Sequence, residues 1–247
     1  MATEAPLNGE QTTSLPGVEL LWIGRVAEHA ADALAHRGVL DAEESARLDG
    51  FVRTQDRDAY AVGHVALRRL LGARLGRAPE AVVMEREPCT QCTGPHGRPV
   101  VPGNAVHFSL SHTKGMVLIA LASDPVGIDV EGLPRPTTVA DITPQLHPVE
   151  RGEIERIPVD QRPLAFARCW TRKESVLKAR GVGLNEDLSL TYVGAGPQPA
   201  ANAHWLLADV PVDPGFAAAV AVCRSHAPDA EAAPDAEAAP DAAAQAG

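Results

Sequence analysis

The chain has 247 residues, of which 45% are apolar and 22% are charged. This length fits one large domain or two small ones, and the composition excludes a wholly disordered or collagen-like chain. Of the formal net charge of −10, the segment 226–247 carries −5 and residues 1–15 carry −2, which leaves −3 for the body. A body without a strong basic excess argues against a nucleic-acid-binding protein.

The two ends of the chain do not have the composition of a folded core. In 226–247 a proline recurs every six residues, and the segment holds no aromatic or branched apolar residue. We therefore expect residues 1–15 and 226–247 to be disordered. No apolar run approaches the roughly 18 residues that a membrane-spanning helix needs, and the N-terminus does not resemble a signal peptide. These features predict a cytoplasmic protein outside the membrane, with reduced cysteines.

Two helices are predicted after a short apolar strand at 18–23. Asp41 and Glu44 have the spacing of a capping box, which predicts a helix start; this helix carries Arg47. In the segment 57–75, apolar residues are separated by combinations of three and four positions, which indicates an amphipathic helix. Arg68 and Arg74 fall off its apolar face.

Strands dominate the middle of the chain, and another helix follows them. A long helix is predicted over 162–180, ended by Gly181. A run of strands, then a helix, then further strands indicates an α+β fold rather than a doubly wound sheet. The predicted strands, bounded by Pro and Gly breaks, cover 80–85, 105–110, 116–121, 126–131, 188–192, 205–210 and 216–223.

Two acidic residues alternate with apolar ones in the strand predicted at 126–131. Because side chains alternate between the faces of a strand, Asp129 and Glu131 project together while Ile128 and Val130 enter the core. Neighbouring carboxylates repel unless they share a cation, and two hard oxygen donors suit Mg²⁺. An exposed polar face of an edge strand would explain the same pattern without a function.

Trp170, Glu174 and Lys178 share one face of the long helix, at intervals of four residues. A surface pair between Glu174 and Lys178 would need no function. The neighbouring tryptophan instead argues for partial burial of this face.

Ser111 and Thr113 flank His112 near the end of a predicted strand. His112 could donate a hydrogen bond to a phosphate, or be a structural histidine in a turn. No Gly-x-Ser-x-Gly motif is present, which argues against a hydrolase triad.

Cys89, Cys92 and His96 form a separate group with the spacing of metal ligands. A structural zinc would need a fourth ligand, and the other two cysteines are far away in the sequence. A turn with two free thiols is the preferred interpretation.

Taken together, the motifs resemble the 4′-phosphopantetheinyl transferase superfamily, of the longer Sfp type. The resemblance extends from about residue 40 to 223, and its motifs follow the family's order. They are His-Gly-Arg-Pro at 96–99, Ser-His-Thr at 111–113, Gly-Ile-Asp-Val-Glu at 127–131 and Trp-Thr-Arg-Lys-Glu-Ser-Val-Leu-Lys at 170–178.

The resemblance implies two similar α+β lobes, at 16–123 and 124–225, with the active site in the cleft between them. It implies a Mg²⁺-dependent enzyme that transfers the phosphopantetheine arm of coenzyme A to a serine of an apo acyl, polyketide or peptidyl carrier protein and releases 3′,5′-ADP. We expect a monomer. The alternative is a non-catalytic module of the same fold that binds a carrier protein or a nucleotide.

The resemblance also assigns residues. The implied Mg²⁺ ligands are Asp129, Glu131 and Glu174, and Glu174, Lys178 and Asp129 are the implied catalytic residues. The implied coenzyme contacts are Lys178 and His112 at the phosphates and Ser111 and Arg98 near the nucleotide and pantetheine. The nearest cations for the 3′-phosphate are Arg47, Arg53 and Arg57. His64 stands where many relatives carry arginine.

Overall fold

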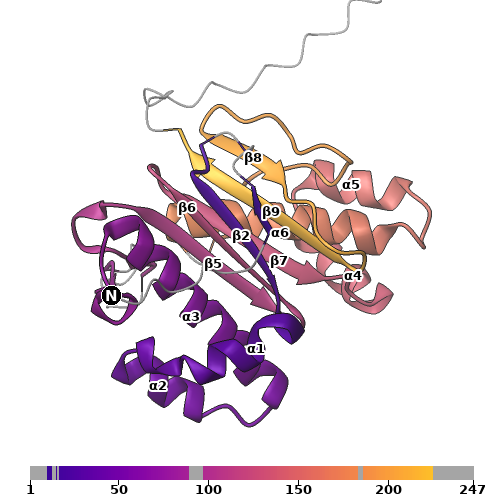
Figure 1. Ribbon diagram of the computed structural model, residues 1–247. Helices are drawn as coiled ribbons and strands as arrows, with labels where there is room; N and C mark the ends of the chain where they lie inside the picture. The colour runs from indigo at the N-terminus through magenta and orange to yellow at the C-terminus, as the bar shows by residue number, and fades with distance from the viewer. Residues whose placement is uncertain (1–9, 13–14, 16, 89–96, 183–185, 225–247) are drawn as a thin grey trace, which may run out of the picture.

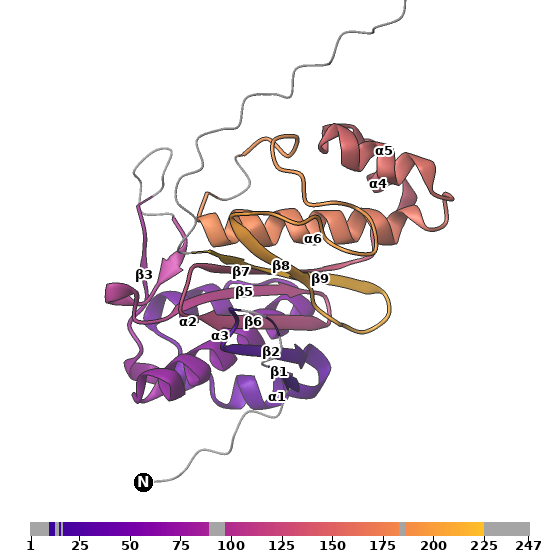
Figure 2. The ribbon, with the colours of Figure 1, turned by 90° about the horizontal axis from the view of Figure 1, so that it is seen from above.

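The computed structural model describes residues 10–12, 15, 17–88, 97–182 and 186–224. The described chain forms two antiparallel sheets that pack face to face, with helices on both outer sides (Figures 1 and 2). The predicted α+β class is confirmed. None of the described helices is long and apolar enough to cross a bilayer.

The N-terminal part supplies the first sheet and the helices that cover it. Its strand order is β1-β2-β6-β5, made of Glu10–Thr12, Leu20–Arg25, Met116–Ala122 and His107–Thr113. The helices are α1 (Val26–Ala35), α2 (Ala42–Asp49) and α3 (Thr54–Leu75). Short elements complete this part: 3₁₀ turns at Arg37–Val39, Pro79–Ala81 and Pro102–Asn104, and the hairpin of β3 (Glu85–Arg86) and β4 (Pro99–Val100).

The C-terminal part supplies a second sheet of three strands. Its order is β7-β9-β8, made of Val126–Gly132, Phe216–Cys223 and Trp205–Asp209. Its helices are α4 (Pro136–Ile142), α5 (Pro148–Arg156) and α6 (Arg162–Arg180), with a 3₁₀ turn at Thr143–Gln145. Helix α6 packs on the sheet, and α4 and α5 pack on α6. Figure 2 shows α6 on the side of this sheet that faces away from α3.

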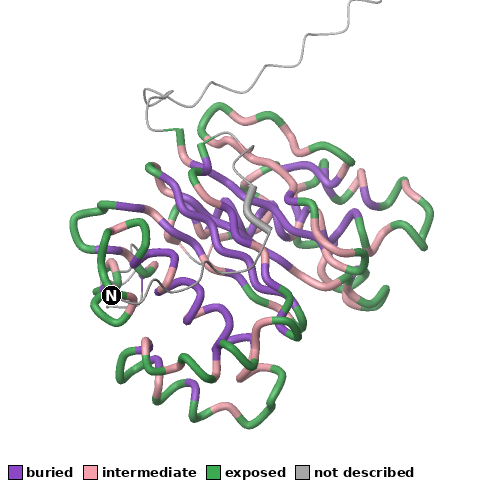
Figure 3. The backbone as a smooth tube through the Cα atoms, viewed as in Figure 1, coloured by how far each residue is buried: buried purple, intermediate pink, exposed green. Residues whose placement is uncertain are grey.

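Strand β6 is buried on both faces, which explains its uninterrupted apolar sequence. Val117 and Ile119 pack with the residues of α1 and α3, whereas Leu118 and Ala120 pack between the two sheets. The central strands are accordingly the most continuously buried part of the chain (Figure 3).

Serine side chains join the two sheets where their edge strands β5 and β7 meet. The Ile128 amide donates to Ser109 Oγ at 3.0 Å, and the Val130 amide donates to Ser111 Oγ at 3.3 Å. From the first of these bonds to the second, the residue number rises by two in both β5 and β7, so the two strands run in the same direction. These hydroxyls satisfy buried amides and hold β5 beside the strand that carries Asp129.

Helix α6 lies directly on β7 because Gly127 has no side chain. A Cβ at Gly127 would lie 1.9 Å from the Ser175 carbonyl oxygen and 2.5 Å from the Ala179 nitrogen. The predicted end of α6 at Gly181 is confirmed, and this glycine has a φ of +72°.

The structure corrects several predictions. Residues 80–84 form a 3₁₀ turn and coil before β3, and 188–192 are turn and coil rather than strand. The predictions missed α1, α4 and α5. Residues 10–12 form β1 within the segment expected to be disordered.

Arg68 lies off the apolar face of α3 but is buried, with only 1% of its side chain exposed. Its guanidinium bonds Glu44 and Asp41 and the Val82 carbonyl. Arg68 therefore stabilises the predicted capping box of Asp41 and Glu44, which is confirmed.

Candidate functional site

A cavity of about 1080 Å³ lies where β5 and β7 meet, bounded by α2, α3 and the β3–β4 hairpin on one side and by α6 on the other. It brings together residues from motifs that are far apart in the sequence. The charged residues that carry the argument are Arg47, His112, Asp129, Glu131, Glu174 and Lys178, all of which line it.

Asp129 is buried, which excludes the exposed edge-strand explanation for this residue. Its Oδ1 lies 2.6 Å from Lys178 Nζ and accepts a hydrogen bond of 2.9 Å from Ser111 Oγ. Lys178 Nζ also donates to Ser111 Oγ and to the Ile128 carbonyl, each at 3.1 Å. This network ties β5, β7 and α6 together at the floor of the cavity.

Glu174 is also buried, with 8% of the residue exposed, so it is not part of a surface ion pair. Burial, followed by the nearby charge of Asp129, raises the pKa of Glu174 to about 7. The same two causes raise the pKa of Glu131. Trp170, one turn before Glu174, lines the cavity as well, so the predicted shared face is confirmed.

The three carboxylates have the character of a cation site. Asp129 Oδ2 and Glu174 Oε1 are buried and have no hydrogen-bond partner among the described residues. Oxygen donors that repel one another and lack partners suit a hard divalent cation such as Mg²⁺. As the side chains are placed, no group of three or more His, Cys, Asp or Glu residues in the described ranges could hold a metal ion.

The raised pKa of Glu174 predicts that the metal-free protein loses stability as the pH rises. Because the folded pKa of about 7 exceeds the ordinary glutamate pKa of 4.5, the contribution is fully present below pH 4.5 and is lost as the pH rises through 7. We expect the free energy of unfolding to fall between pH 5 and pH 8 by roughly 3 kcal/mol more than in a Glu174→Gln variant. Urea unfolding with a chelator present measures this difference; parallel pH profiles for the two proteins would contradict it.

The wall opposite α6 carries Arg47, His64 and His112. Loss of solvent lowers the pKa of His112, and the charges of His64, Lys178 and Arg47 lower it further. His64 Nδ1 lies 2.9 Å from Glu44 Oε1, and its ring stacks on Tyr60 at 3.9 Å. Sequence reasoning did not assign Tyr60 and Glu44 to the site, because both lie in stretches that read as ordinary helix.

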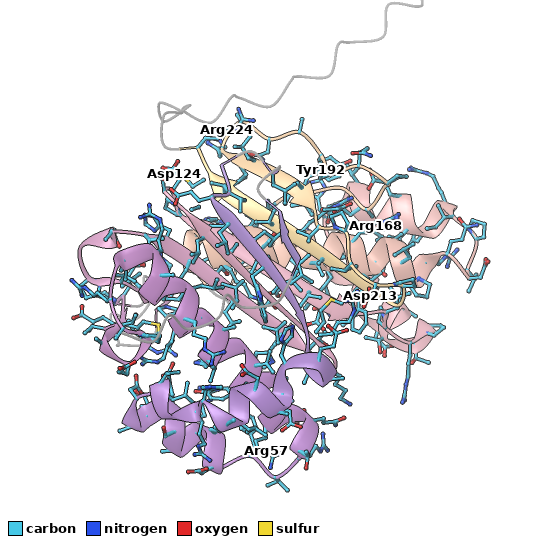
Figure 4. All side chains as sticks on the ribbon, in the orientation of Figure 1. Arg57, Asp124, Arg168, Tyr192, Asp213 and Arg224 are labelled. Carbon is cyan, nitrogen blue, oxygen red and sulfur yellow. The ribbon has the colours of Figure 1, made fainter. Side chains whose placement is uncertain are left out.

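Several predicted coenzyme contacts are placed differently. Arg47 lines the cavity, but Arg53 and Arg57 are not among its lining residues. Arg57 pairs with Asp58 at the periphery of the N-terminal helices (Figure 4). Ser111 lines the cavity, and its hydroxyl donates a hydrogen bond to Asp129. Arg98 lines the cavity as well, and its guanidinium is bonded to Glu87.

The proposed zinc ligands Cys89, Cys92 and His96 lie outside the described residues. The other two cysteines, Cys169 and Cys223, are free thiols.

Comparisons with known proteins show the family of this chain. The family described as "4'-phosphopantetheinyl transferase superfamily" matches residues 125–221, which span β7 to β9 and include the three carboxylates. The 4'-phosphopantetheinyl transferase HetI of Nostoc sp. is 30% identical over 193 residues, which cover 74% of this chain and 78% of that protein. The chain therefore belongs to the 4′-phosphopantetheinyl transferase superfamily.

Two relatives from Bacillus subtilis extend the likeness over most of their length. The 4'-phosphopantetheinyl transferase ffp is 28% identical, covering 77% of this chain and 90% of the relative. The 4'-phosphopantetheinyl transferase Sfp is 27% identical, covering 76% of this chain and 88% of the relative.

Proposed function

We propose that this chain transfers the 4′-phosphopantetheine arm of coenzyme A to a serine hydroxyl of an apo carrier protein and releases 3′,5′-ADP. The observation that carries the proposal is the meeting of Asp129, Glu131, Glu174 and Lys178 in one cavity. Relatives named for this transferase activity align over most of the chain.

The architecture supports the Sfp type and a division into two lobes, at 16–123 and 124–225. Each part has a sheet with helices packed on its outer face, α1 and α3 in one part and α6 in the other, and the inner faces of the two sheets pack together. The cavity takes residues from both parts, as an active site in a cleft between lobes requires.

Magnesium dependence rests on the three carboxylates. Asp129, Glu131 and Glu174 would hold the ion, with the unpartnered Asp129 Oδ2 and Glu174 Oε1 as oxygens available to it. When bound, Mg²⁺ neutralises negative charge that builds on the pyrophosphate oxygens during transfer.

The residues around the carboxylates have distinct roles in the proposed reaction. The serine hydroxyl attacks the β-phosphorus of coenzyme A. The bond from this phosphorus to the oxygen that bridges it to the α-phosphate breaks, and the electron pair leaves with 3′,5′-ADP. Lys178 offsets charge on this leaving group, and His112 and Arg47 bind phosphate oxygens from the opposite wall. Glu174 lies in the same cavity, where its carboxylate can take the serine proton.

Incubating the protein with an apo carrier protein, coenzyme A and Mg²⁺ tests this function. Mass spectrometry should show a mass gain on the carrier equal to one phosphopantetheinyl group. If several apo carriers gain no mass while the protein binds coenzyme A, the non-catalytic binding module is the better account.

Thermal unfolding tests the metal ligands without an activity assay. At pH 8 and Mg²⁺ near 100 times its dissociation constant, binding should add about 2.7 kcal/mol, which corresponds to a Tm increase of about 5 °C or more. We expect Glu131→Gln to lose most of this increase. Glu155→Gln, on the exposed face of α5, is the matched control. An equal Mg²⁺ effect in Glu131→Gln would remove Glu131 from the ligand set.

A further inference from the structure

Arg98 connects the β3–β4 hairpin to the end of α6. Its Nε and Nη2 donate to the two carboxylate oxygens of Glu87 at 2.8 and 3.0 Å. Its Nη1 donates to the Ala179 carbonyl at 2.9 Å, across 81 residues of sequence. The Glu87 amide also donates to the Arg98 carbonyl at 3.0 Å, so the two residues face each other next to the Arg86–Pro99 pair of the hairpin.

The Ala179 carbonyl is a specific target at this helix end. The last carbonyls of a helix have no partner within the helix. The amides of Val182 and Gly181 satisfy the Leu177 and Lys178 carbonyls at 3.3 and 3.1 Å. Arg98 supplies the donor for the next carbonyl, Ala179, and places a cation where the helix dipole favours one.

Close packing accompanies this hydrogen bond. A Cβ at Gly181 would lie 3.3 Å from Arg98 Cδ, so the arginine stem lies against the turn that ends the helix. Arg98 thus contacts the α6 terminus through both its guanidinium and its aliphatic part. The residue before Ala179 is Lys178, whose Nζ holds Asp129.

We propose that Arg98, held by Glu87, is a positioning residue that fixes the last turn of α6 and thereby the place of Lys178 and Glu174 in the cavity. This inference rests on the proposed transferase function and refines the role of Arg98. The Glu87 carboxylate offsets the guanidinium charge and binds two of its three nitrogens, which suits a structural clamp better than an anion ligand.

The two roles predict opposite effects of removing Glu87. If Arg98 binds a phosphate of coenzyme A, Glu87→Ala frees its charge, and the KM for coenzyme A should stay the same or fall. If Arg98 positions α6, Glu87→Ala loosens the clamp. A displacement of about 1 Å at a reacting group can cost on the order of 10²-fold in rate.

The test compares Glu87→Ala, Arg98→Ala and the double variant in the mass-spectrometric transfer assay. We expect kcat to fall about 10- to 100-fold in each, with the KM for coenzyme A within about threefold of wild type. The double variant should be no slower than Arg98→Ala, because both changes remove one clamp. Glu155→Ala, which removes a glutamate paired with arginine on α5, should leave kcat unchanged.

Hydrogen exchange gives a readout that does not depend on transfer. The amides of Gly181 and Val182 should exchange faster in Glu87→Ala than in wild type and Glu155→Ala, because the helix end frays. A raised KM with normal kcat in Arg98→Ala, together with normal kinetics and exchange in Glu87→Ala, would overturn the proposal. If wild type itself shows no transfer, the proposed function fails, but the exchange result still supports or overturns the clamp.

Discussion

Glu174→Gln should slow phosphopantetheine transfer by about 10²- to 10⁴-fold, the usual contribution of a general base. Glutamine keeps the size of the side chain but can neither accept the serine proton nor contribute a negative charge to a cation site. The loss should appear in kcat, since Glu174 acts on the reacting groups rather than on the distant parts of coenzyme A.

The same variant should remain folded. Glu174 Oε1 has no hydrogen-bond partner within the described part of the chain, so the substitution breaks no bond there. It also removes a charge that Asp129 and Glu131 repel, and the free energy of unfolding of the metal-free protein at pH 8 should rise. Urea unfolding and the transfer assay, with Glu155→Gln as control, measure both effects. Transfer within tenfold of wild type would exclude Glu174 as the base.

Gly127→Ala should destabilise the protein by about 3 kcal/mol, at the upper end of the usual cost of overpacking. The added methyl would meet the Ser175 oxygen at 1.9 Å and the Ala179 nitrogen at 2.5 Å. Both atoms belong to the backbone of α6, so no side-chain rotation can relieve the overlap. The helix must move away from β7, and it carries Glu174 and Lys178 away from Asp129.

A second glycine of the same strand provides the control. At Gly132 an added Cβ would meet only the Gly215 oxygen, at 4.0 Å. We expect Gly132→Ala to change the unfolding free energy by less than about 0.5 kcal/mol, as at a surface position. Chemical denaturation and kcat should separate the two variants, and equal stability of both would contradict direct packing of α6 on β7 at Gly127.

Local patterns in the sequence predicted the elements that carry the chemistry. The capping box at Asp41, the long helix ending at Gly181 and the strand that carries Asp129 and Glu131 all occur where periodicity and turn residues indicated. Each signal depends on neighbours within a few residues. Examples are a capping residue three positions from its partner and side chains that share a helix face at intervals of four residues. The motif order also indicated the family, which the comparison with HetI confirms.

The burial of the site residues and the identity of their hydrogen-bond partners could not be predicted from local sequence patterns. An aspartate that alternates with apolar residues has the same pattern on an exposed edge as beside a second sheet, and Asp129 is 3% exposed because β5 and α6 cover it. The sequence also carried no sign that Arg98 binds Glu87 and Ala179, the second of which is 81 residues away.

The order of residues along the chain was enough to establish which groups could do chemistry and which helices and strands carry them. Their ionisation and their distances arise from packing between segments far apart in sequence. The pKa of Glu174 is about 7 because folding removes water from its carboxylate and brings Asp129 close to it. Coulomb and desolvation energies depend on separation in space, and a linear pattern does not specify that separation.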